Sequence, residues 1–508
     1  MEPKMDAVKT QGRILEPLIY DIGAPGRKVS TLLPKCDVPE APLPDASLLR
    51  ADLDLPEVSE LDVVRHYVKL SQMNYAIDKG FYPLGSCTMK YNPKIDEDTA
   101  RLPGFALLHP LQDTVQTQGA LLLMHTLQSW LAEIVGMDAV SLQPAAGAQG
   151  ELAGILIIRA YHADRGDTKR TKILVPNSAH GTNPATSAMV GYQVVELPSN
   201  AEGNVDMDAL RREADDTVAG MMITVPSTIG VFDRNIVEII EIIHGCGGLM
   251  YMDGANMNAL LGVIKPGKLG FDVLHYNLHK TFSTPHGGGG PGSGPVAVNH
   301  KLADFLPGPI VGITEYANAT NAAPLYGWQM PVKSIGRLKA FHGNFGMHVR
   351  AYTYIRLHGL AGINAISRHA VLNANYIRVK LADTYKVPYN RMCGHEVVIE
   401  GRFADVPDVH ALDISKRLMD YGYHPPTNYF PLIVPEALLI EPTESESKQT
   451  LDLFIDAMKK IAAEAHSDPE LLHSAPHITP VGRVDEVQAA KQLVLCCRPI
   501  PEWDSTQS

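Results

Sequence analysis

The hydrophobic positions between residues 114 and 136 recur at helical spacing. The apolar residues in this stretch are mostly three or four positions apart: Leu121, Met124, Leu127, Leu131, Ile134 and Val135. Such spacing places apolar side chains on one face of a helix. Gly136 follows them, and glycine is common just after the last turn of a helix. The pattern therefore predicts an amphipathic helix from about Thr114 to Gly136.

Downstream of this helix, short apolar runs alternate with helical stretches. The runs that we interpret as strands are Lys172 to Val175, Gln193 to Leu197, Gly220 to Val225, Gly248 to Met252 and Val273 to Tyr276. This alternation is typical of βα units on a largely parallel sheet. Most of the runs precede loops rich in Gly, Pro, Ser, Asn or His. In open α/β sheets ligands bind beyond the carboxyl ends of the strands, so we expect the chemistry in these loops.

The residues before and after this region differ from it in pattern. The first 60 or so residues are rich in Pro and acidic side chains, which favours an arm with short helices. After about Pro331 the pattern predicts a long helix, a strand and two more helices: Arg337 to Lys380, Glu396 to Glu400, Val409 to Tyr421 and Ser447 to Ala465. We expect an N-terminal arm over residues 1–75, a large α/β domain over 76–330 and a smaller α+β domain over 331–508.

The composition excludes several classes of protein. With 508 residues, 45% hydrophobic and 20% charged, the chain can bury more than one core and differs from disordered and fibrous sequences. The net charge of −12 and the absence of a Lys/Arg cluster disfavour nucleic-acid binding, which requires clustered cations. No apolar run approaches the ~20 residues that cross a bilayer. We therefore predict no nucleic-acid partner and no membrane span.

The cysteines and the N-terminus favour the cytoplasm. Six cysteines are scattered along the chain without a C-x-x-C motif: Cys36, Cys87, Cys246, Cys393, Cys496 and Cys497. This distribution is typical of a reducing compartment. The first 13 residues include Glu2 and Asp6 and lack a long apolar core, so we expect neither a secretory signal nor a transit peptide.

Lys280 lies in a polar turn at the end of the last predicted strand. Most lysines only solubilise a surface, so Lys280 needs support from its surroundings. Asp253 follows the preceding strand, 27 residues earlier, which would put both residues at neighbouring strand ends. A lysine that forms a Schiff base and a carboxylate that keeps a pyridine nitrogen protonated are the groups that pyridoxal phosphate (PLP) requires. Asp253 could equally cap a helix beginning at Gly254.

A small-residue turn, residues 144–151, opens directly into a helical run at Leu152 to Ile158. Free backbone N–H groups at a helix start bind anions, and the helix dipole reinforces this. We therefore expect Gly147, Ala148 and Gln149 to hold the phosphate of a cofactor. The turn could also use glycine only to relieve backbone strain.

Two further loops offer groups that suit the same ligand. His180 follows the strand that ends at Val175, and its imidazole could lie flat on a pyridine ring, although a lone histidine more often serves as an ordinary hydrogen-bonding residue. Ser227 and Thr228 follow another strand and offer hydroxyls to a phenolate oxygen or to substrate.

Two competing motifs fail in their structural context. Gly287, Gly289 and Gly292 satisfy G-x-G-x-x-G, but prolines interrupt the run and no helix opens after it, which excludes a dinucleotide site. His275 and His279 are four residues apart, as zinc ligands on a helix are, yet the stretch is predicted as strand and turn. We therefore predict no metal site.

These motifs, in chain order, resemble the large domain of the aspartate-aminotransferase-like (fold type I) PLP enzymes. Four stretches are similar to a narrower family, the P-protein of the glycine cleavage system: Tyr82 to Pro93, Asn177 to Ala185, Met252 to Asn256 and Leu278 to Phe282. The similarity extends from about Tyr75 to Glu446. It concerns the half of the P-protein that carries the lysine, so the chain resembles the second, cofactor-binding subunit of a split P-protein.

The resemblance implies a cofactor, a reaction and partners. PLP would form a Schiff base with Lys280, and the catalytic residues would be Lys280, His180 and Asp253. Cofactor contacts would also come from Gly147, Ala148, Gln149, Thr228, Asn256, Asn277 and His279. The reaction would decarboxylate glycine and transfer the aminomethyl group to the lipoyl group of the H-protein. A homologous first subunit would complete a heterotetramer with two copies of each chain.

Some assignments stay open at this point. Ser86, Cys87 and Thr88 lie in a plausible substrate loop, and no arginine in these motifs is an obvious clamp for the glycine carboxylate. The chain could instead be another fold type I enzyme, such as an aminotransferase or a different amino-acid decarboxylase. A non-catalytic assembly subunit on the same fold is a further alternative, which the presence of Lys280 disfavours.

Overall fold

A computed structural model describes residues 16–27, 37–50, 55–109, 112–288, 290–316 and 324–495. Glu2, Asp6, Cys36, Gly289, Cys496 and Cys497, on which sequence predictions rest, lie outside these ranges. The chain divides into two compact units, one of Met1–Lys79 with His473–Ser508 and one of Gly80–Leu472. The second unit contains most of the predicted large domain and residues 331–472 of the predicted small domain, whereas residues 473–508 belong to the first unit. The boundary near residue 330 therefore stays a prediction. The predicted arm over residues 1–75 likewise stays one.

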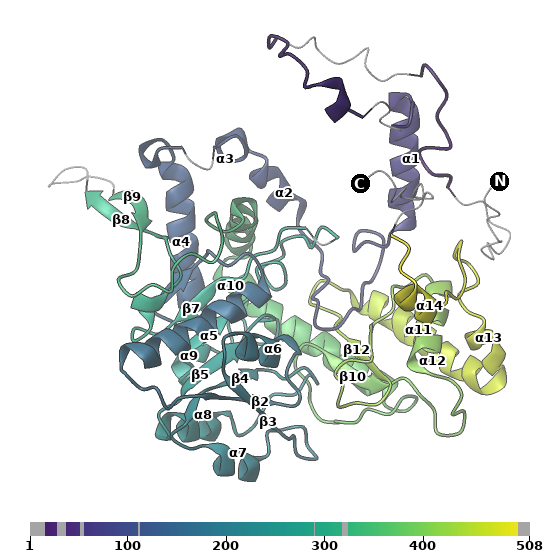
Figure 1. Ribbon diagram of the computed structural model, residues 1–508. Coiled ribbons are helices and arrows are strands. Elements are labelled where there is room, and N and C mark those ends of the chain that lie inside the picture. The colour runs from purple at the N-terminus through teal and green to yellow at the C-terminus, as the bar shows by residue number, and fades with distance from the viewer. Residues whose placement is uncertain are drawn as a thin grey trace. The chain divides into compact units, whose positions relative to one another are not determined.

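A seven-stranded sheet forms the centre of the second unit, with strand order β1-β7-β6-β5-β4-β2-β3 (Figure 1). Its strands are β1 (Ala139–Ser141), β2 (Lys172–Pro176), β3 (Gln193–Leu197), β4 (Val218–Thr224), β5 (Leu249–Asp253), β6 (Val273–His275) and β7 (Val296–Val298). Only β7 runs antiparallel to its neighbours. The predicted mainly parallel α/β sheet is therefore confirmed, and the five predicted strands correspond to β2–β6.

Helices cover both faces of this sheet. Successive residues of β5 alternate between two apolar cores: Met250 and Met252 pack in one, and Leu249 and Tyr251 pack in the other. This alternation follows from the two-residue period of a strand. The covering helices are α4 (Gln118–Val135), α5 (Gly147–Asp164), α6 (Thr182–Met189), α7 (Met207–Glu213), α8 (Ile236–Gly245) and α9 (Pro266–Leu269). Residues of α4 and α8 belong to the first core and residues of α5 to the second.

The helix predicted from Thr114 to Gly136 is present but begins later. Residues Thr114–Gln116 form a 3₁₀ turn, and α4 starts at Gln118 after the non-helical Thr117. Gly136 ends the helix in the left-handed conformation, with φ of 71°, which glycine adopts without the steric cost that a Cβ would add.

The remainder of the second unit is built on a three-stranded antiparallel sheet with order β10-β12-β11. Its strands are β10 (Val397–Glu400), β11 (Thr427–Asn428) and β12 (Ala437–Ile440), and its helices are α10 (Phe345–Leu381), α11 (Ala411–Asp420), α12 (Lys448–Ser467) and α13 (Pro469–His473). The long predicted helix from Arg337 was too long: α10 begins at Phe345 and is broken at Gly359, whose φ of 56° and ψ of −173° are not helical.

Smaller elements complete the second unit. They are the helices α2 (Lys94–Ala100) and α3 (Pro103–Ala106), the 3₁₀ turn η4 (Ala303–Phe305), and the hairpin of β8 (Ile310–Tyr316) and β9 (Pro324–Gln329). Helix α2 packs against α10, where Arg350 pairs with Glu97.

The first unit contains three short helical elements among its described residues: η2 (Ala46–Leu48), α1 (Glu60–Met73) and α14 (Glu486–Lys491). Helix α1 begins with a capping box in which Ser59 and Asp62 satisfy each other's backbone N–H groups. None of the helices in the described ranges is long and apolar enough to cross a membrane.

We expect substitution of Leu127 by alanine to destabilise the second unit. Leu127 is fully buried on α4, and removing a buried leucine side chain costs about 2–5 kcal/mol of unfolding free energy. Leu122 on the same helix is 46% exposed, so L122A should change that free energy by less than about 0.5 kcal/mol. Urea unfolding followed by circular dichroism measures both, and equal effects would contradict the assigned packing of α4.

Candidate functional site

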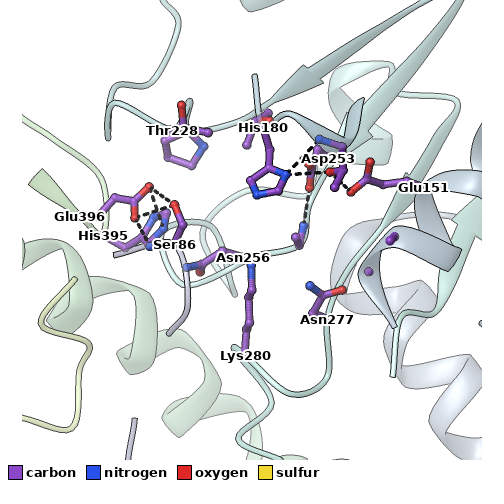
Figure 2. Close-up of a pocket in the computed structure, with 16 residues that line it drawn as sticks. Ser86, Glu151, His180, Thr228, Asp253, Asn256, Asn277, Lys280, His395 and Glu396 are labelled. Atoms are coloured by element: carbon purple, nitrogen blue, oxygen red, sulfur yellow. Dashed lines mark hydrogen bonds and ion pairs between the residues drawn. The ribbon is translucent and has the colours of Figure 1, made fainter. Parts of the chain in front are cut away.

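A cavity of about 190 Å³ opens at the carboxyl ends of the parallel strands (Figure 2). Strand register puts Thr224 beside Asp253 and Asp253 beside His275, so the ends of β4, β5 and β6 are level. The residues that line the cavity are Ser86, Gly147, Ala148, Glu151, His180, Thr182, Thr224, Pro226, Thr228, Asp253, Ala255, Asn256, Asn277, Lys280, His395 and Glu396. Nine of them are among our predicted site residues. Gln149, His279, Cys87 and Thr88 are not among the lining residues, and their predicted roles stay predictions.

Lys280 enters the middle of the cavity from the turn after β6. Figure 2 shows its side chain pointing between two groups of polar residues, with Ser86, His395 and Glu396 on one side and Asp253 and Glu151 on the other. Its backbone N–H donates to the carbonyl of Asn277 over 3.1 Å, which closes the turn. The buried side chain of Lys90 approaches the same turn and donates to the carbonyl of Thr281.

Asp253 ends β5 and is 4% exposed. Its carboxylate accepts hydrogen bonds from the side-chain amide of Asn183 and the backbone N–H of Ala255, each over 3.0 Å, and lies 3.6 Å from His275 Nε2. Burial raises the pKa of Asp253, but His275 and these donors outweigh burial and hold the pKa below its ordinary value. The site therefore contains a buried anion. The alternative that Asp253 caps a helix is wrong, because residues 254–265 form turns and no helix.

A second carboxylate lies behind Asp253. Glu151, the fifth residue of α5, accepts from Asn183 over 3.1 Å and from the hydroxyl of Thr182 over 2.8 Å. Burial and the negative charge of Asp253 raise the pKa of Glu151 to about 7. Asn183 thus links two carboxylates of different pKa. No pattern in the sequence indicates this role of Glu151, although the residue closes the small-residue turn of residues 144–151.

The start of α5 presents free backbone donors to the cavity. Ala146 precedes the helix in an extended conformation and makes no side-chain cap, so the first N–H groups of an 18-residue helix lack side-chain partners. Gly147 packs so closely on Asn277 that a Cβ would lie 2.7 Å from the Asn277 amide atoms. Gln149 points elsewhere: its side chain accepts from the N–H of Ala145 and donates to the carbonyl of Leu338.

His180 and Thr228 line the wall formed after β2 and β4. His180 Nδ1 lies 2.7 Å from the hydroxyl oxygen of Thr182. Desolvation lowers the pKa of His180, so its ring is neutral at neutral pH. Thr228 is buried and donates its hydroxyl to the carbonyl of Ser178.

His279 turns away from the cavity. Its Nδ1 accepts from the backbone N–H of Ser293 over 3.2 Å, and its own carbonyl lies against His286 Nε2. Burial lowers the pKa of His279 to about 3. The side chain packs the turn of Lys280 against the glycine-rich segment that follows.

The predicted substrate loop contacts residues that lie far along the chain. Ser86 and Thr88 have φ of 61° and 54°, and their backbone N–H groups donate to Glu396 and Glu441, respectively. Between them, burial raises the pKa of Cys87 to about 11, which keeps its thiol protonated. Glu396 was predicted only as the first residue of a strand, and neither glutamate was predicted as a site residue, because no local sequence pattern connects them with this loop.

Two groups of buried residues have potential metal-ligating atoms that lie within 4.8 Å of one another in the described ranges: Glu151 with Asp253 and His275, and His395 with Glu396 and Glu441. His275 and His279, the pair considered from the sequence, do not fall in one group. The prediction that the site holds no metal stays a prediction.

Comparison with known families matches two parts of the chain. Residues 366–476 match the model described as "Glycine dehydrogenase, C-terminal domain", and residues 150–290 match "Aminotransferase class-V". The probable glycine dehydrogenase (decarboxylating) subunit 2 of Alkaliphilus oremlandii is 56% identical over 96% of this chain and 99% of that protein. The protein of the same name from Caldanaerobacter subterraneus is 55% identical over 94% of this chain and 98% of that protein.

Solved structures of three kinds of enzyme share the fold. A glycine decarboxylase (P-protein) of the glycine cleavage system, in inhibitor-bound form, matches with a TM-score of 0.66 at 19% identity, covering 85% of this chain and 92% of that one. A cysteine desulfurase from Thermococcus onnurineus matches with 0.58 at 15% identity, covering 76% and 95%. A glutamate decarboxylase from Lactobacillus brevis matches with 0.61 at 14% identity, covering 85% and 95%. At such identities the likeness concerns the fold alone.

We expect Lys90 to be essential for holding the Lys280 turn in place. Its ammonium is buried and pairs with Glu444 over 2.7 Å and with the hydroxyl of Tyr354 over 3.0 Å. Removing one partner of a buried pair leaves an uncompensated charge and costs about 3–5 kcal/mol. Thermal and urea unfolding of K90M should show this loss.

A matched control for this substitution is K448M. Lys448 pairs with Asp452 at the surface, with its side chain 72% exposed, and such pairs contribute less than about 1 kcal/mol. A K90M variant as stable as K448M would contradict the buried ion pair.

Proposed function

The chain belongs to the family of glycine dehydrogenase (decarboxylating) subunit 2, and on this premise we propose that it is the PLP-binding subunit that decarboxylates glycine. The observation that carries the proposal is that Lys280, the one lysine among the cavity's described lining residues, enters the cavity opposite the buried anion Asp253. In the proposed reaction the aminomethyl group that remains after loss of carbon dioxide passes to the lipoyl group of the H-protein.

The residues of the cavity fit each part of PLP. The uncapped first turn of α5 suits a phosphate. The anionic Asp253 suits a protonated pyridine nitrogen, and the neutral ring of His180 suits an aromatic face. Two buried polar atoms at the cavity, Thr224 Oγ1 and Asn277 Oδ1, have no hydrogen-bond partner within the described protein, and a buried polar group of this kind calls for a polar ligand.

When bound, PLP withdraws electrons from the bond that breaks at the substrate carbon. Lys280 supplies the primary amine for its covalent attachment. Asp253 holds a proton at the ring nitrogen through its negative charge, and Asn183 with Ala255 keeps that carboxylate oriented. Glu151 shares Asn183 with Asp253 but has a pKa of about 7. It can therefore carry a proton near neutral pH, and the protonated form places no second negative charge beside Asp253.

The size and charge of the cavity favour a small substrate. Its volume is only about 190 Å³. No arginine is among the cavity's described lining residues, so no guanidinium clamps a carboxylate there. A weakly held carboxylate is consistent with its departure as carbon dioxide, because binding that stabilises only the ground state would slow that step.

The partners and location are proposals of the same kind. Relatives named subunit 2 imply a first subunit, which we propose to be a homologous chain in a heterotetramer with two copies of each. The lipoylated H-protein would be the second partner. Cys87, Cys246 and Cys393 are free thiols among the described cysteines, which supports the reducing cytoplasm as the location.

We expect the purified protein to be yellow and K280A to be colourless. A cofactor held covalently by a lysine absorbs visible light, and the variant lacks the amine to which it attaches. K301A provides the control, since Lys301 is exposed and outside the cavity. Visible absorption spectra of the three proteins test the assignment, and equal colour in K280A and its parent would refute it.

We also expect exchange of labelled bicarbonate into the carboxyl group of glycine. The complete mixture contains this chain, the first subunit and lipoylated H-protein, because the proposed reaction is reversible only with its acceptor present. Assays with free glutamate or free cysteine as the substrate in place of glycine test for the reactions of the enzymes that share the fold. Absence of exchange in the complete mixture would exclude glycine as substrate.

A further inference from the structure

Two buried glutamates lie together at one side of the cavity. Glu396 immediately precedes β10, Glu441 immediately follows β12, and they are 3% and 0% exposed. Their carboxylate oxygens and a ring nitrogen of His395 all lie within 4.8 Å of one another. Two carboxylates so close together in a buried place do not both ionise readily, because each charge raises the pKa of the other.

The hydrogen-bond partners show which of the two carries the proton. Glu441 accepts three good hydrogen bonds: from the backbone N–H of Thr88 over 3.0 Å, from the Thr88 hydroxyl over 2.8 Å and from the amide of Asn256 over 2.8 Å. Glu396 accepts one at 2.7 Å from the N–H of Ser86, and the Ser86 hydroxyl is distant at 3.3–3.4 Å. Burial raises the pKa of Glu441 as well, although its donors and Lys280 act in the opposite direction. Because donors stabilise a carboxylate and Glu441 has three against one close donor for Glu396, the charge resides on Glu441 and the proton on Glu396.

Burial, followed by the negative charge of Glu441, raises the pKa of Glu396 to about 8. The other groups that face Glu396 are Lys280, whose charge acts in the opposite direction, and Cys87 and His395. Burial raises the pKa of Cys87 to about 11 and lowers that of His395 to about 3, so both are neutral near pH 7. Glu396 is therefore a neutral acid at physiological pH.

Glu396 lines the cavity, whereas Glu441 does not. Figure 2 shows Glu396 grouped with Ser86 and His395 on one side of Lys280. Both ring nitrogens of His395 are buried and have no hydrogen-bond partner within the described protein, although the residue lines the cavity. This side of the cavity thus offers hydrogen-bond donors, and no arginine is among the described lining residues. A buried imidazole without a hydrogen-bond partner indicates that a polar ligand belongs there.

We propose that protonated Glu396, together with Ser86 and His395, forms the subsite that binds the carboxylate of a small α-amino acid. The inference rests on the proposed function, since it locates the glycine carboxylate that the sequence could not. A carboxylic acid that donates to a carboxylate holds the substrate by a charge-assisted hydrogen bond. Because the donor is neutral, it opposes the loss of the carboxylate's charge less than a guanidinium would when carbon dioxide departs.

The test measures binding rather than turnover. Glycine and methylamine are titrated separately into the holoenzyme with its first subunit, without H-protein, and the shift of the cofactor's visible absorption gives the affinity. Methylamine offers the same kind of amine without a carboxylate. We expect E396A to weaken glycine binding roughly 10- to 100-fold, the value of a hydrogen bond to a charged group, and to leave methylamine binding unchanged within about threefold.

The conservative variant E396Q should retain most of the glycine affinity, because its amide still donates. E400Q is the matched control: Glu400 lies at the other end of β10, pairs with Lys386 and Arg402, and is outside the cavity. It should bind both ligands as the parent does. Equal glycine affinity in E396A and the parent would refute the subsite while leaving the function intact, whereas no response of the parent to glycine would refute the function itself.

The proton on Glu396 gives a second, independent readout. In the parent, glycine affinity should be constant below about pH 8 and fall above it, as Glu396 ionises and repels the substrate carboxylate. E396Q cannot ionise and should lack this fall, while titrations of other groups are common to both proteins. Identical pH profiles would contradict the proposal.

Infrared spectra near neutral pH provide a readout that needs no ligand. The difference spectrum between the parent and E396Q should contain the carbonyl stretch of one protonated carboxylic acid, and that between the parent and E400Q should not. Lys386 and Arg402 lower the pKa of Glu400 and keep it ionised despite its burial, and the protonated fraction of Glu151 cancels in both differences. A divalent cation that co-purifies with the parent and is absent from E396Q would overturn the proposal, since metal binding requires the ionised carboxylate.

Discussion

The convergence of parallel strand ends is the constraint on which the site depends. Since β2, β4, β5 and β6 run in one direction, the loops after them open at one edge of the sheet. Register then fixes their relative heights, with Thr224, Asp253 and His275 side by side. The residues that follow these strands, which are the predicted cofactor contacts, are therefore positioned by the sheet itself. Because β5 and β6 pair, the aspartate at the end of β5 and the lysine in the turn after β6 lie at the same edge of the sheet.

The protonation states of the carboxyl groups around the cavity follow from their burial close together. Four carboxyl groups, Glu151, Asp253, Glu396 and Glu441, are buried around one lysine. They cannot all be ionised at low cost. Neighbouring charges and donors decide the outcome. His275 with two donors lowers the pKa of Asp253, and three donors oppose the effect of burial on Glu441. Burial and a charged neighbour raise the pKa values of Glu151 and Glu396 to about 7 and about 8. Each side of Lys280 thus combines one anion with one weaker acid.

The sequence predicts the fold and half of the site well, for physical reasons. The strands β2–β6 are apolar runs bounded by turn residues, and their loops carry the lysine and aspartate in an order that identifies the family. The three-residue strands β1 and β7 are too short to give a periodic signal. Glu396 and Glu441 escaped notice because their role comes from tertiary contacts: Ser86 and Glu396 are 310 residues apart. Gln149 and His279 have the right positions in the chain, but their side chains complete the turns instead of the cavity.

The wide separation of the two sides of the cavity along the chain also sets an order of appearance during synthesis. A ribosome releases the turn of α5, Asp253 and Lys280 before it has made Glu396 or Glu441. The nascent chain thus carries every predicted cofactor contact while the glutamate side is still absent. The antiparallel sheet of β10, β11 and β12 must then dock onto the loop of Ser86 and Thr88 to close the cavity. The cavity is therefore complete only after the whole second unit has folded, because only then do the predicted cofactor contacts and the two glutamates lie together.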